Sequence, residues 1–497
     1  MKILKNVLHI SGAIALASIF SACTESGTEP IFNPNPVGDY SSSSYKNPYS
    51  SASFSPNSIQ YEELEYNYDL LDLYYLYAHR NGELKDFDNY TMEYVPYYDS
   101  KSYCTKKYAN TCYLYGDMSD PFTRYFDPEY AQQIMDLLTY SEANVGIGAQ
   151  AKEVKVNDSI KVVIDQVYEN GPAEKAGLAV GDTVLKINDL DITYIERFDA
   201  MTNGRNSERL TIEVNRGDSV KSLTVIQGEY NTPTVFLTFE DSIPVIRITE
   251  FDQASTTPKG SYGEFVRTLK KIKDDYKAAI IDLRDNPGGD VEHCSKMSGE
   301  LLNAGDTIII DIETNVDSSG YGNSKNYFQK FDTTAYTAET DGIGKNLYYV
   351  FLANENSASC AELMLSAVTV NKKSPVVGQT TYGKGIGQYV IPTTYVADGL
   401  ALITGLESMD KNGGIYHKVG IVPDYAIDDS DKQMKKAVEI AKNALDGNKE
   451  ERKEGYGTES TGNFAKAKAQ SNFTIPTSKK ELLDQMSGTY KFKNSAK

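Results

Sequence analysis

The chain has 497 residues, of which 40% are hydrophobic, and this length and composition favour two or three packed domains. Its formal net charge of −19 at pH 7 argues against a nucleic-acid partner, since such a partner requires a basic face that displaces counterions. Only four histidines are present, so a hydrolytic site built on the usual histidine base has few candidates.

The N-terminal residues predict an export signal rather than part of the fold. Lys2 and Lys5 precede an apolar run, 7–20, which is shorter than the roughly 20 residues that a membrane-spanning helix requires. The run ends in F-S-A-C at Cys23, which resembles the bacterial lipobox. This resemblance implies a lipoprotein signal peptide, 1–22, and a lipid anchor on Cys23. An ordinary signal peptide with an incidental cysteine is the alternative.

The next two segments are predicted as a tether and a helical region. Residues 23–58 are rich in Ser, Pro and Asn, a composition typical of a flexible tether. From 59 to 140, leucines and tyrosines recur at helical spacing, and a helix is expected to begin near Asp127. Cys104 and Cys112 are close in sequence, and export permits disulfides, so we expect a local bridge between them.

Short β-rich runs separated by turns occupy residues 141–230 and contain V-G-I-G-A and E-N-G-P-A-E-K-A-G-L-A-V-G-D. This segment resembles a PDZ domain of the circularly permuted type found in bacterial proteases. The N–H groups of Gly146, Ile147 and Gly148 are expected to face the C-terminal carboxylate of a peptide that adds a strand to the sheet edge. A small β-domain without a ligand is the alternative.

Buried strands alternate with amphipathic helices from 231 to 446, which predicts an α/β region. Strands at 278–283 and 347–352 carry almost no polar residues, as strands of parallel sheets do. The remaining residues, 447–497, form a polar tail in which only 479–486 has helical spacing.

Three motifs of the α/β region follow predicted strands. D-L-R-D-N-P-G-G-D places Gly288 and Gly289 where a strand runs into a helix, a turn whose backbone N–H groups suit an oxyanion. N-S-A-S-C-A-E places Ser359 at a helix start, with the Cys360 N–H as a further oxyanion donor. T-Y-G-K-G-I-G-Q surrounds Lys384 with glycines, which allow a close approach to another backbone segment.

These motifs predict a Ser-Lys hydrolase. A serine hydroxyl is a poor nucleophile until a base takes its proton. A lysine is such a base when burial lowers its pKa toward neutrality. Ser359 and Lys384 lie 384 − 359 = 25 residues apart and are the candidate pair. The alternatives are that Ser359 only caps a helix and that Lys384 is a solvated surface residue.

In order and spacing, the motifs resemble those of the C-terminal processing (tail-specific) proteases over roughly residues 110–445; they include D-P-F-T-R-Y, I-P-V-I-R-I-T-E-F, D-L-R-D-N-P-G-G, N-S-A-S-C-A-E, V-V-G-Q-T-T-Y-G-K-G-I-G-Q and V-G-I-V-P-D. The resemblance implies that Ser359 is the nucleophile, Lys384 the general base and Gln388 the residue that orients the lysine. It implies no metal and no other cofactor. Family members usually carry alanine at the position of Cys360.

The same resemblance implies an α/β catalytic core of the ClpP/crotonase-like type, with an inserted PDZ domain and a helical N-terminal region. The expected function is a serine endopeptidase of a bacterial cell envelope that cleaves unfolded or C-terminally tagged proteins, whose tails the PDZ domain binds. An activating adaptor lipoprotein is a partner that the sequence neither requires nor excludes. The alternatives are a catalytically silent PDZ scaffold lipoprotein and an esterase, although the G-x-S-x-G motif of α/β-hydrolases is missing.

Four residues near these motifs are expected to have supporting roles. Cys294 and Cys360 follow the first two motifs and are expected as buried thiols. His293 is expected to be a surface or supporting residue, and the local spacing gives His417 no nucleophile partner. The glycines around the lysine lack the spacing of a phosphate-binding P-loop.

Overall fold

The computed structural model describes residues 56–92, 95, 104–139, 144–156, 159–253, 255–256, 259–316, 329–394, 396–459 and 461. The predicted signal peptide with Cys23, nearly all of the predicted tether, and the tail beyond 461 with the predicted helix at 479–486 lie outside the described residues. Within the described residues, no helix combines the length and the apolar composition needed to cross a membrane.

The described N-terminal region is mainly helical, with α1 (Ile59–Tyr74), α2 (Tyr77–Arg80), η2 (Phe87–Asn89), η3 (Lys106–Tyr108), α3 (Ala109–Gly116) and α4 (Ala131–Thr139). The carbonyl of Asp127 accepts the N–H of Ala131, the first residue of α4, at 2.9 Å, close to the predicted helix start. A disulfide joins Cys104 to Cys112, which confirms the predicted local bridge.

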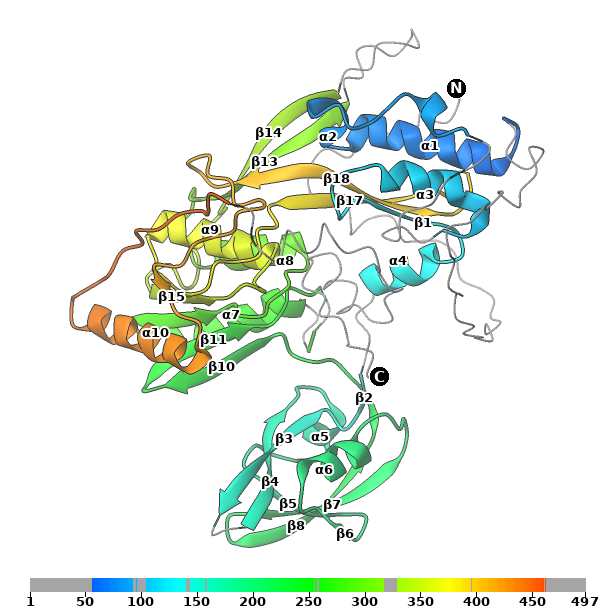
Figure 1. The fold of residues 1–497 in the computed structure, drawn as a ribbon. Helices are drawn as coiled ribbons and strands as arrows, with labels where there is room; N and C mark the ends of the chain where they lie inside the picture. The colour runs from blue at the N-terminus through cyan, green and yellow to red at the C-terminus, as the bar shows by residue number, and fades with distance from the viewer. Residues whose placement is uncertain are drawn as a thin grey trace.

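These helices cover an antiparallel sheet (Figure 1). Its strand β1 belongs to the N-terminal region, and its remaining strands come from the second half of the chain. The sheet contains β1 (Arg124–Phe126), β13 (Thr307–Val316), β14 (Gln329–Thr337), β17 (Ile386–Pro392) and β18 (Leu400–Met409), in the order β1-β18-β13-β14 with β17 also paired to β18. The apolar side chains of α1 and α3 share a core with Tyr125, Ala401 and Ile403. The N-terminal helices therefore pack on a strand from the second half of the chain.

A second sheet forms the centre of the α/β region and has the order β10 (Val235–Glu240), β11 (Ile243–Ile248), β12 (Ala278–Asp282), β15 (Tyr348–Ala353), β16 (Val376–Gly378) and β19 (Tyr425–Ala426). β10 and β11 are antiparallel, and the remaining neighbours are parallel. β12 ends one residue before the predicted strand 278–283, and β15 is displaced by one residue at both ends from the predicted strand 347–352.

Helices cover both faces of this sheet because successive side chains of a strand point to opposite sides. Ala279 and Ile281 pack with the helices of one face, whereas Ala278 and Ile280 pack with the other. The first face carries α7 (Gly260–Ile272), α8 (Val291–Gly299) and α9 (Cys360–Lys372), and the second carries α10 (Ser430–Leu445). The parallel strands β12, β15 and β16 end at one edge, which brings the three predicted motifs together.

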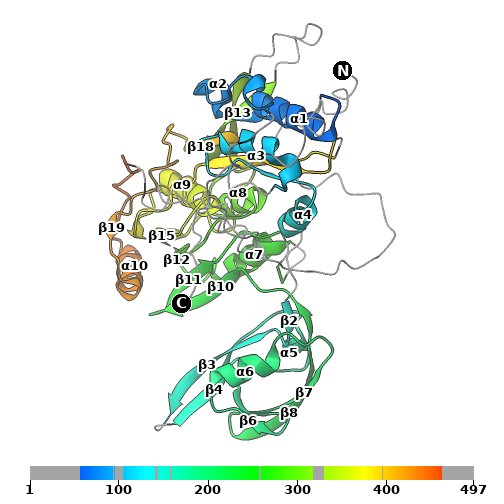
Figure 2. The same cartoon turned by 45° about the vertical axis from the view of Figure 1, so that its right-hand side comes forward.

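The predicted PDZ segment is a separate β-rich unit in both cartoon views (Figures 1 and 2). It contains β2 (Asn144–Gly146), β3 (Ala149–Val156), β4 (Ser159–Val167), α5 (Pro172–Lys175), β5 (Thr183–Ile187), β6 (Leu190–Asp191), α6 (Ile195–Thr202), β7 (Arg209–Arg216), β8 (Ser219–Ile226) and β9 (Gly228–Tyr230). The unit has its own apolar core around Phe198. An ion pair between Glu169 and Arg267 of α7 connects it to the α/β region.

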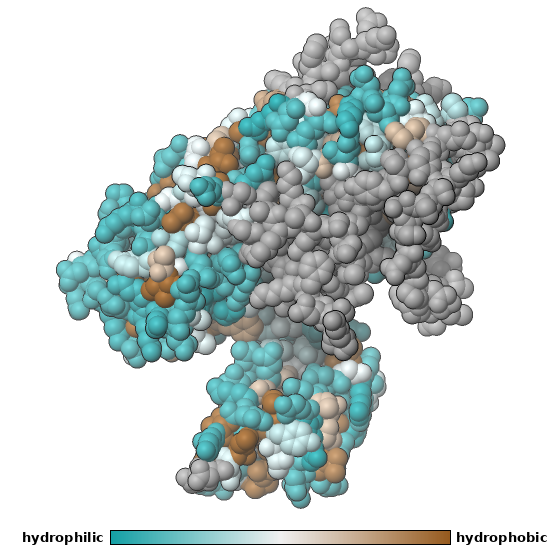
Figure 3. All heavy atoms as spheres, in the orientation of Figure 1, coloured by the Kyte–Doolittle hydropathy of each residue, from teal (hydrophilic) through white to brown (hydrophobic). Residues whose placement is uncertain are grey.

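The surface of this unit is mixed in character. Figure 3 shows apolar residues among polar ones on the face turned to the viewer. The exposed large apolar side chains of the segment are Val156, Ile160, Val180, Leu190, Tyr194, Val220 and Ile226.

After α10 the described chain returns to the α/β region and contacts the turn-rich segment 418–422. Ile421 forms an isolated antiparallel bridge with Tyr456, and the N–H of Thr461 donates to the carbonyl of Lys418 at 2.7 Å. The first part of the predicted polar tail, up to 461, thus packs against the folded core.

Candidate active site

Ser359 lies at the N-terminus of α9, directly after the loop that follows β15. Its φ of 54° and ψ of −117° form a conformation that residues other than glycine rarely adopt. The Ser359 N–H donates to Glu362 at 3.0 Å, and its carbonyl accepts the N–H of Leu363 at 2.9 Å. The backbone of the predicted nucleophile is thus held in a strained turn by its own helix.

The glycine pair after β12 lies directly against this turn. Gly288 and Gly289 have φ values of 105° and 136°, a region that favours glycine. A Cβ atom on Gly288 would lie 2.8 Å from the Cβ of Ser359 and 3.0 Å from the backbone N of Cys360. A Cβ on Gly289 would lie 2.1 Å from the carbonyl oxygen of Phe251. Close packing therefore excludes side chains at both positions.

The three predicted oxyanion donors do not have equivalent environments. The N–H of Gly288, a predicted oxyanion donor, donates to Oδ1 of Asn286 at 2.8 Å and is occupied in this structure. Neither the N–H of Gly289 nor that of Cys360 has an acceptor among the described residues. Two donors, one from each segment, remain for an oxyanion.

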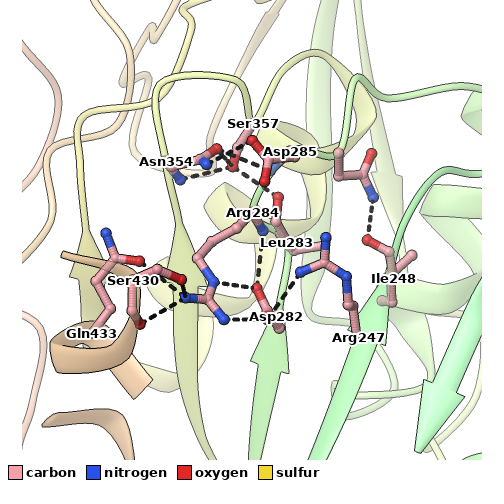
Figure 4. Close-up of polar contacts among 11 residues, drawn as sticks. Arg247, Ile248, Asp282, Leu283, Arg284, Asp285, Asn354, Ser357, Ser430 and Gln433 are labelled. Atoms are coloured by element: carbon pink, nitrogen blue, oxygen red, sulfur yellow. Dashed lines mark hydrogen bonds and ion pairs between the residues drawn. The ribbon is translucent and has the colours of Figure 1, made fainter. Parts of the chain in front are cut away.

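A polar network joins the two loops on the side nearer the sheet (Figure 4). The Oγ of Ser357 donates to the carbonyl of Leu283 at 2.8 Å, and the N–H of Ala358 donates to the carbonyl of Asn286 at 2.9 Å. The Nδ2 of Asn286 in turn donates to the carbonyl of Ile248 at 2.9 Å. The serine turn and the glycine loop are therefore fixed to one another and to β11.

Arg284 anchors the same loop to α10 (Figure 4). Its guanidinium donates to both carboxylate oxygens of Asp282, at 2.8 and 2.7 Å, and to Ser430 and Gln433 at the start of α10. Burial lowers the pKa of Arg284, but the Asp282 hydrogen bonds and charge outweigh it, and the pKa is raised overall. Arg284 stays ionised and ties the glycine loop to the helix on the opposite face of the sheet.

Lys384 is 5% exposed and lies between β16 and β17. Burial lowers its pKa from 10.5 to about 8, opposed by the charge of Asp120 and reinforced by that of Arg124. The Lys384 Nζ lies 4.7 Å from the ring centre of Phe122, and this ring packs in a small apolar cluster with Ala358. Lys384 thus has the environment of a base, close to the serine turn.

Glu362 connects the serine and lysine motifs and was not singled out from the sequence. Its buried carboxylate accepts the N–H groups of Ser359, Gly383 and Lys384, at 3.0, 2.7 and 2.7 Å, and the hydroxyl of Thr381 at 2.5 Å. Burial raises its pKa to about 7, although these hydrogen bonds act to lower it. The S-x-x-E spacing of a helix capping box was the available sequence signal.

Gln388 lies on β17 and forms no hydrogen bond with Lys384 within the described part of the chain. Its Nε2 donates to Oγ1 of Thr404 at 3.0 Å, and this hydroxyl donates to Asp120 at 2.6 Å. Asp120 is the group whose charge acts to raise the pKa of Lys384. The link from glutamine to lysine therefore passes through Thr404 and Asp120, and Asp120 lies far from both motifs in sequence.

The two histidines near the motifs differ in their surroundings. His293, in α8, accepts the N–H of Tyr262 at 3.4 Å, and burial lowers its pKa. His417 is buried next to Gly385, whose Cβ would lie 3.0 Å from the His417 N. Burial, then the charge of Lys418, lowers the pKa of His417 to about 3, so the imidazole is neutral near pH 7. The fold brings His417 beside Lys384, which the local spacing did not predict.

The expectation of free thiols at Cys294 and Cys360 is wrong, because the two sulfurs form a disulfide between α8 and α9. The helices pack side by side, which brings together cysteines separated by 66 residues in sequence. No cluster of three or more His, Cys, Asp or Glu side chains suited to a metal ion occurs among the described residues.

The predicted peptide-binding loop of the β-rich unit has the expected tight turn. Gly148 has a φ of 69°, and a Cβ there would lie 3.1 Å from the ring of Tyr230. A Cβ on Gly146 would lie 2.6 Å from the carbonyl oxygen of Thr202. The N–H of Ile147, a predicted carboxylate donor, donates to this same carbonyl at 2.9 Å and is occupied in this structure.

Comparisons with known proteins agree with these motifs. Residues 242–427 match the model of peptidase family S41, and residues 163–216 match that of a PDZ domain. A probable CtpA-like serine protease of Staphylococcus aureus is 27% identical over 315 residues, 63% of this chain, and that of Staphylococcus haemolyticus is 26% identical over the same length. The chain spans 58% of the length of these relatives. The resemblance to C-terminal processing proteases is confirmed.

Solved structures of low sequence identity also match. A photosystem II D1 C-terminal processing protease is 18% identical, with a TM-score of 0.43, and the match covers 75% of this chain and 93% of that one. A putative S41 protease from Bacteroides fragilis is 14% identical, with a TM-score of 0.43, and the match covers 78% and 98% of the two chains.

Proposed function

We propose that this chain, in which residues 242–427 belong to peptidase family S41, is a serine endopeptidase that uses a Ser359–Lys384 dyad. The observation that carries the proposal is the environment of Lys384, which is buried with its pKa lowered to about 8 and shares the carboxylate of Glu362 with Ser359. A lysine in this state is neutral in a usable fraction of molecules near neutral pH.

The chemical step follows from these positions. Neutral Lys384 takes the proton of the Ser359 hydroxyl while Oγ attacks the carbonyl carbon of the scissile peptide bond. The oxyanion that forms is stabilised by the N–H groups of Gly289 and Cys360. The C–N bond then breaks, the lysine ammonium returns its proton to the leaving amine, and an ester to Ser359 remains. A water that gives its proton to Lys384 hydrolyses this ester.

Gln388 acts on this step through its neighbours. We assign to it the positioning of Thr404, whose hydroxyl donates to Asp120. The carboxylate of Asp120 favours the charged form of Lys384 and so limits how far burial lowers the lysine pKa. Gln388 is therefore a positioning residue for the base.

The β-rich unit is proposed to bind the C-terminal tails of unfolded or tagged protein substrates. β3 is an edge strand that pairs only with β4 within the described sheet, and α6 packs beside it. A peptide can add a strand at this edge, with its carboxylate at the turn of Gly146, Ile147 and Gly148. The N–H of Ile147 must leave the carbonyl of Thr202 for this purpose, which makes tail binding dependent on a local rearrangement.

The domain division and cellular location are proposals of the same kind. We assign a signal peptide to 1–22, a tether to 23–58, a helical region to 59–140, a PDZ domain to 141–230, a ClpP/crotonase-like core to 231–446 and a tail to 447–497. The parallel sheet with helices on both faces supports the core assignment. The F-S-A-C sequence at Cys23 supports a lipid anchor in a bacterial cell envelope, where an adaptor lipoprotein is a conceivable activator.

The deciding experiment incubates residues 24–497 with an unfolded protein that ends in apolar residues, and follows the fragments by mass spectrometry. We expect cleavage by the parent and none by Ser359→Ala or Lys384→Ala. Lys372→Ala is the matched control, since Lys372 also has a pKa lowered by burial but donates to the carbonyl of Lys345, away from the serine. Full activity of Lys384→Ala would refute the dyad.

Two further measurements separate the remaining parts of the proposal. A tail peptide with a free carboxylate is expected to bind more tightly than its C-terminal amide, and equal affinity would refute carboxylate recognition. Binding without cleavage under every condition would favour the silent scaffold instead. Full-length protein expressed in a bacterium is expected in the membrane fraction, and the Cys23→Ser variant in the soluble fraction.

A further inference from the structure

The Cys294–Cys360 disulfide joins α8 to α9 beside the two proposed oxyanion donors. Cys360 directly follows Ser359, and Cys294 lies 294 − 289 = 5 residues after Gly289. The two Cα atoms are 5.8 Å apart, within the range that a disulfide spans. The side chains are 0% and 2% exposed, so the bond is shielded from solvent.

We propose that the Cys294–Cys360 disulfide is a positioning element of the catalytic site, which holds the N–H groups of Gly289 and Cys360 at the spacing that an oxyanion requires. The inference rests on the proposed peptidase function and goes beyond it, since it makes full turnover dependent on the oxidised cysteine pair. The disulfide touches no reacting atom and acts through the two backbone donors beside it.

The local geometry explains why the bond acts on these two donors. The Sγ of Cys360 lies 3.5 Å from the carbonyl oxygen of Gly289, so the sulfur contacts the residue that supplies the other donor. Gly288 and Gly289 have positive φ values and no side chains, and glycine has more conformational freedom than any other residue. A link between α8 and α9 limits the freedom of the loop between β12 and α8.

Hydrogen bonds also join the loop after β12 to the loop after β15, on the side nearer the sheet. The N–H of Ala358 donates to the carbonyl of Asn286, and Ser357 donates to the carbonyl of Leu283. These bonds fix the loop before Gly288, whereas the disulfide fixes the helices that follow each donor. The two attachments together hold the oxyanion site from both sides.

The bond forms by thiol–disulfide exchange with a protein that carries an oxidised dithiol. The two thiols lose two protons and two electrons, the Sγ–Sγ bond forms, and the exchange partner is reduced to its dithiol. An exported protein meets such oxidants outside the cytoplasm. The burial of both sulfurs then slows reduction of the bond by small reductants without preventing it.

The test compares the parent with the double variant Cys294→Ala/Cys360→Ala, in which the Cys360 backbone N–H is retained. The matched control is Cys104→Ala/Cys112→Ala, which removes the disulfide of the N-terminal helices. Non-reducing peptide mapping of the parent is expected to find residues 294 and 360 cross-linked. We expect kcat of the double variant to fall about tenfold, because a small misplacement of oxyanion donors is costly.

Two readouts distinguish positioning from general damage to the fold. The KM and the midpoint of the pH–rate profile are expected to stay unchanged in the double variant, since the bond contacts neither Lys384 nor the PDZ segment. The control pair is expected to keep the parent kcat. A double variant with parental kcat, or a parent whose two cysteines alkylate without reduction, would overturn the proposal.

A second measurement, made on the parent, tests the proposal if the double variant does not fold. The parent is incubated with a dithiol for increasing times, and kcat is compared with the fraction of the 294–360 bond that remains. We expect kcat to fall in proportion to the fraction of intact bond. A kcat that stays constant while the bond is lost would contradict the inference. A parent that cleaves nothing refutes the proposed peptidase, whereas an active parent with an equally active bond-free form refutes only the role of the disulfide.

Discussion

The carboxylate of Glu362 accepts the backbone N–H of Lys384 at 2.7 Å and places the proposed base relative to the helix that carries the proposed nucleophile. The same group accepts the N–H of Ser359 at 3.0 Å. The backbone N–H groups of the two proposed catalytic residues therefore share one buried acceptor. A carboxylate suits this task because its two oxygens accept several hydrogen bonds at once.

Glu362→Gln is expected to reduce both activity and stability. Glutamine keeps the shape but has one acceptor oxygen, and its NH₂ group would face backbone donors. Each buried N–H left without an acceptor costs about 1–3 kcal/mol. We expect a lower midpoint in thermal unfolding and a kcat at least about 100-fold lower, since displacement of a catalytic group by 1 Å has such an effect. Parental values of both would show that the shared acceptor is dispensable.

The pH dependence of peptidase activity is expected to follow the neutral form of Lys384. The pKa of this lysine is lowered to about 8, so the neutral fraction and kcat/KM rise with pH and level off above pH 9. The charge of Asp120 acts to raise this pKa, so Asp120→Asn is expected to shift the midpoint to lower pH. The pH–rate profiles of the parent and this variant provide the check, and an upward shift would contradict the assigned sign.

Gly289→Ala is expected to abolish activity and to destabilise the fold. The new Cβ would lie 2.1 Å from the carbonyl oxygen of Phe251, a contact that requires the backbone to move. Gly305→Ala is the matched control, because Gly305 also has a positive φ, of 84°, but no atom within 4 Å of its Cβ position. We expect only about 1 kcal/mol of strain in the control, as measured by denaturant unfolding. Equal effects of both substitutions would assign the loss to backbone strain alone.

Arg284→Ala is expected to lower the free energy of unfolding by about 3–5 kcal/mol, because it leaves the buried Asp282 without its closest partner. The side chains of this pair are 10% and 3% exposed. Lys442→Ala is the control, since its ion pair with Asp241 has side chains that are 46% and 72% exposed and is expected to contribute less than about 1 kcal/mol. Denaturant unfolding of both variants measures the difference, and similar losses would contradict the role of burial.

Several elements could be predicted from local pattern because their residues share one periodicity. β12 and β15 lie within one residue of the predicted strands 278–283 and 347–352 at each end. β13 and β14 were not predicted, since many of their residues are polar and their strand character depends on pairing with each other and with β18. Strands of this kind are specified by their neighbours more than by their own composition.

The two proposed catalytic groups could be named from the sequence alone, because a serine at a helix start and a lysine among glycines are local features of Ser359 and Lys384. Only the tertiary structure decided the low pKa of the lysine, since desolvation arises from Phe122 and other segments packed around it. It also decided that the N–H of Gly288 is occupied and that Cys294 pairs with Cys360. Burial, hydrogen-bond competition and contact between distant residues are properties of the packed chain, which no local pattern contains.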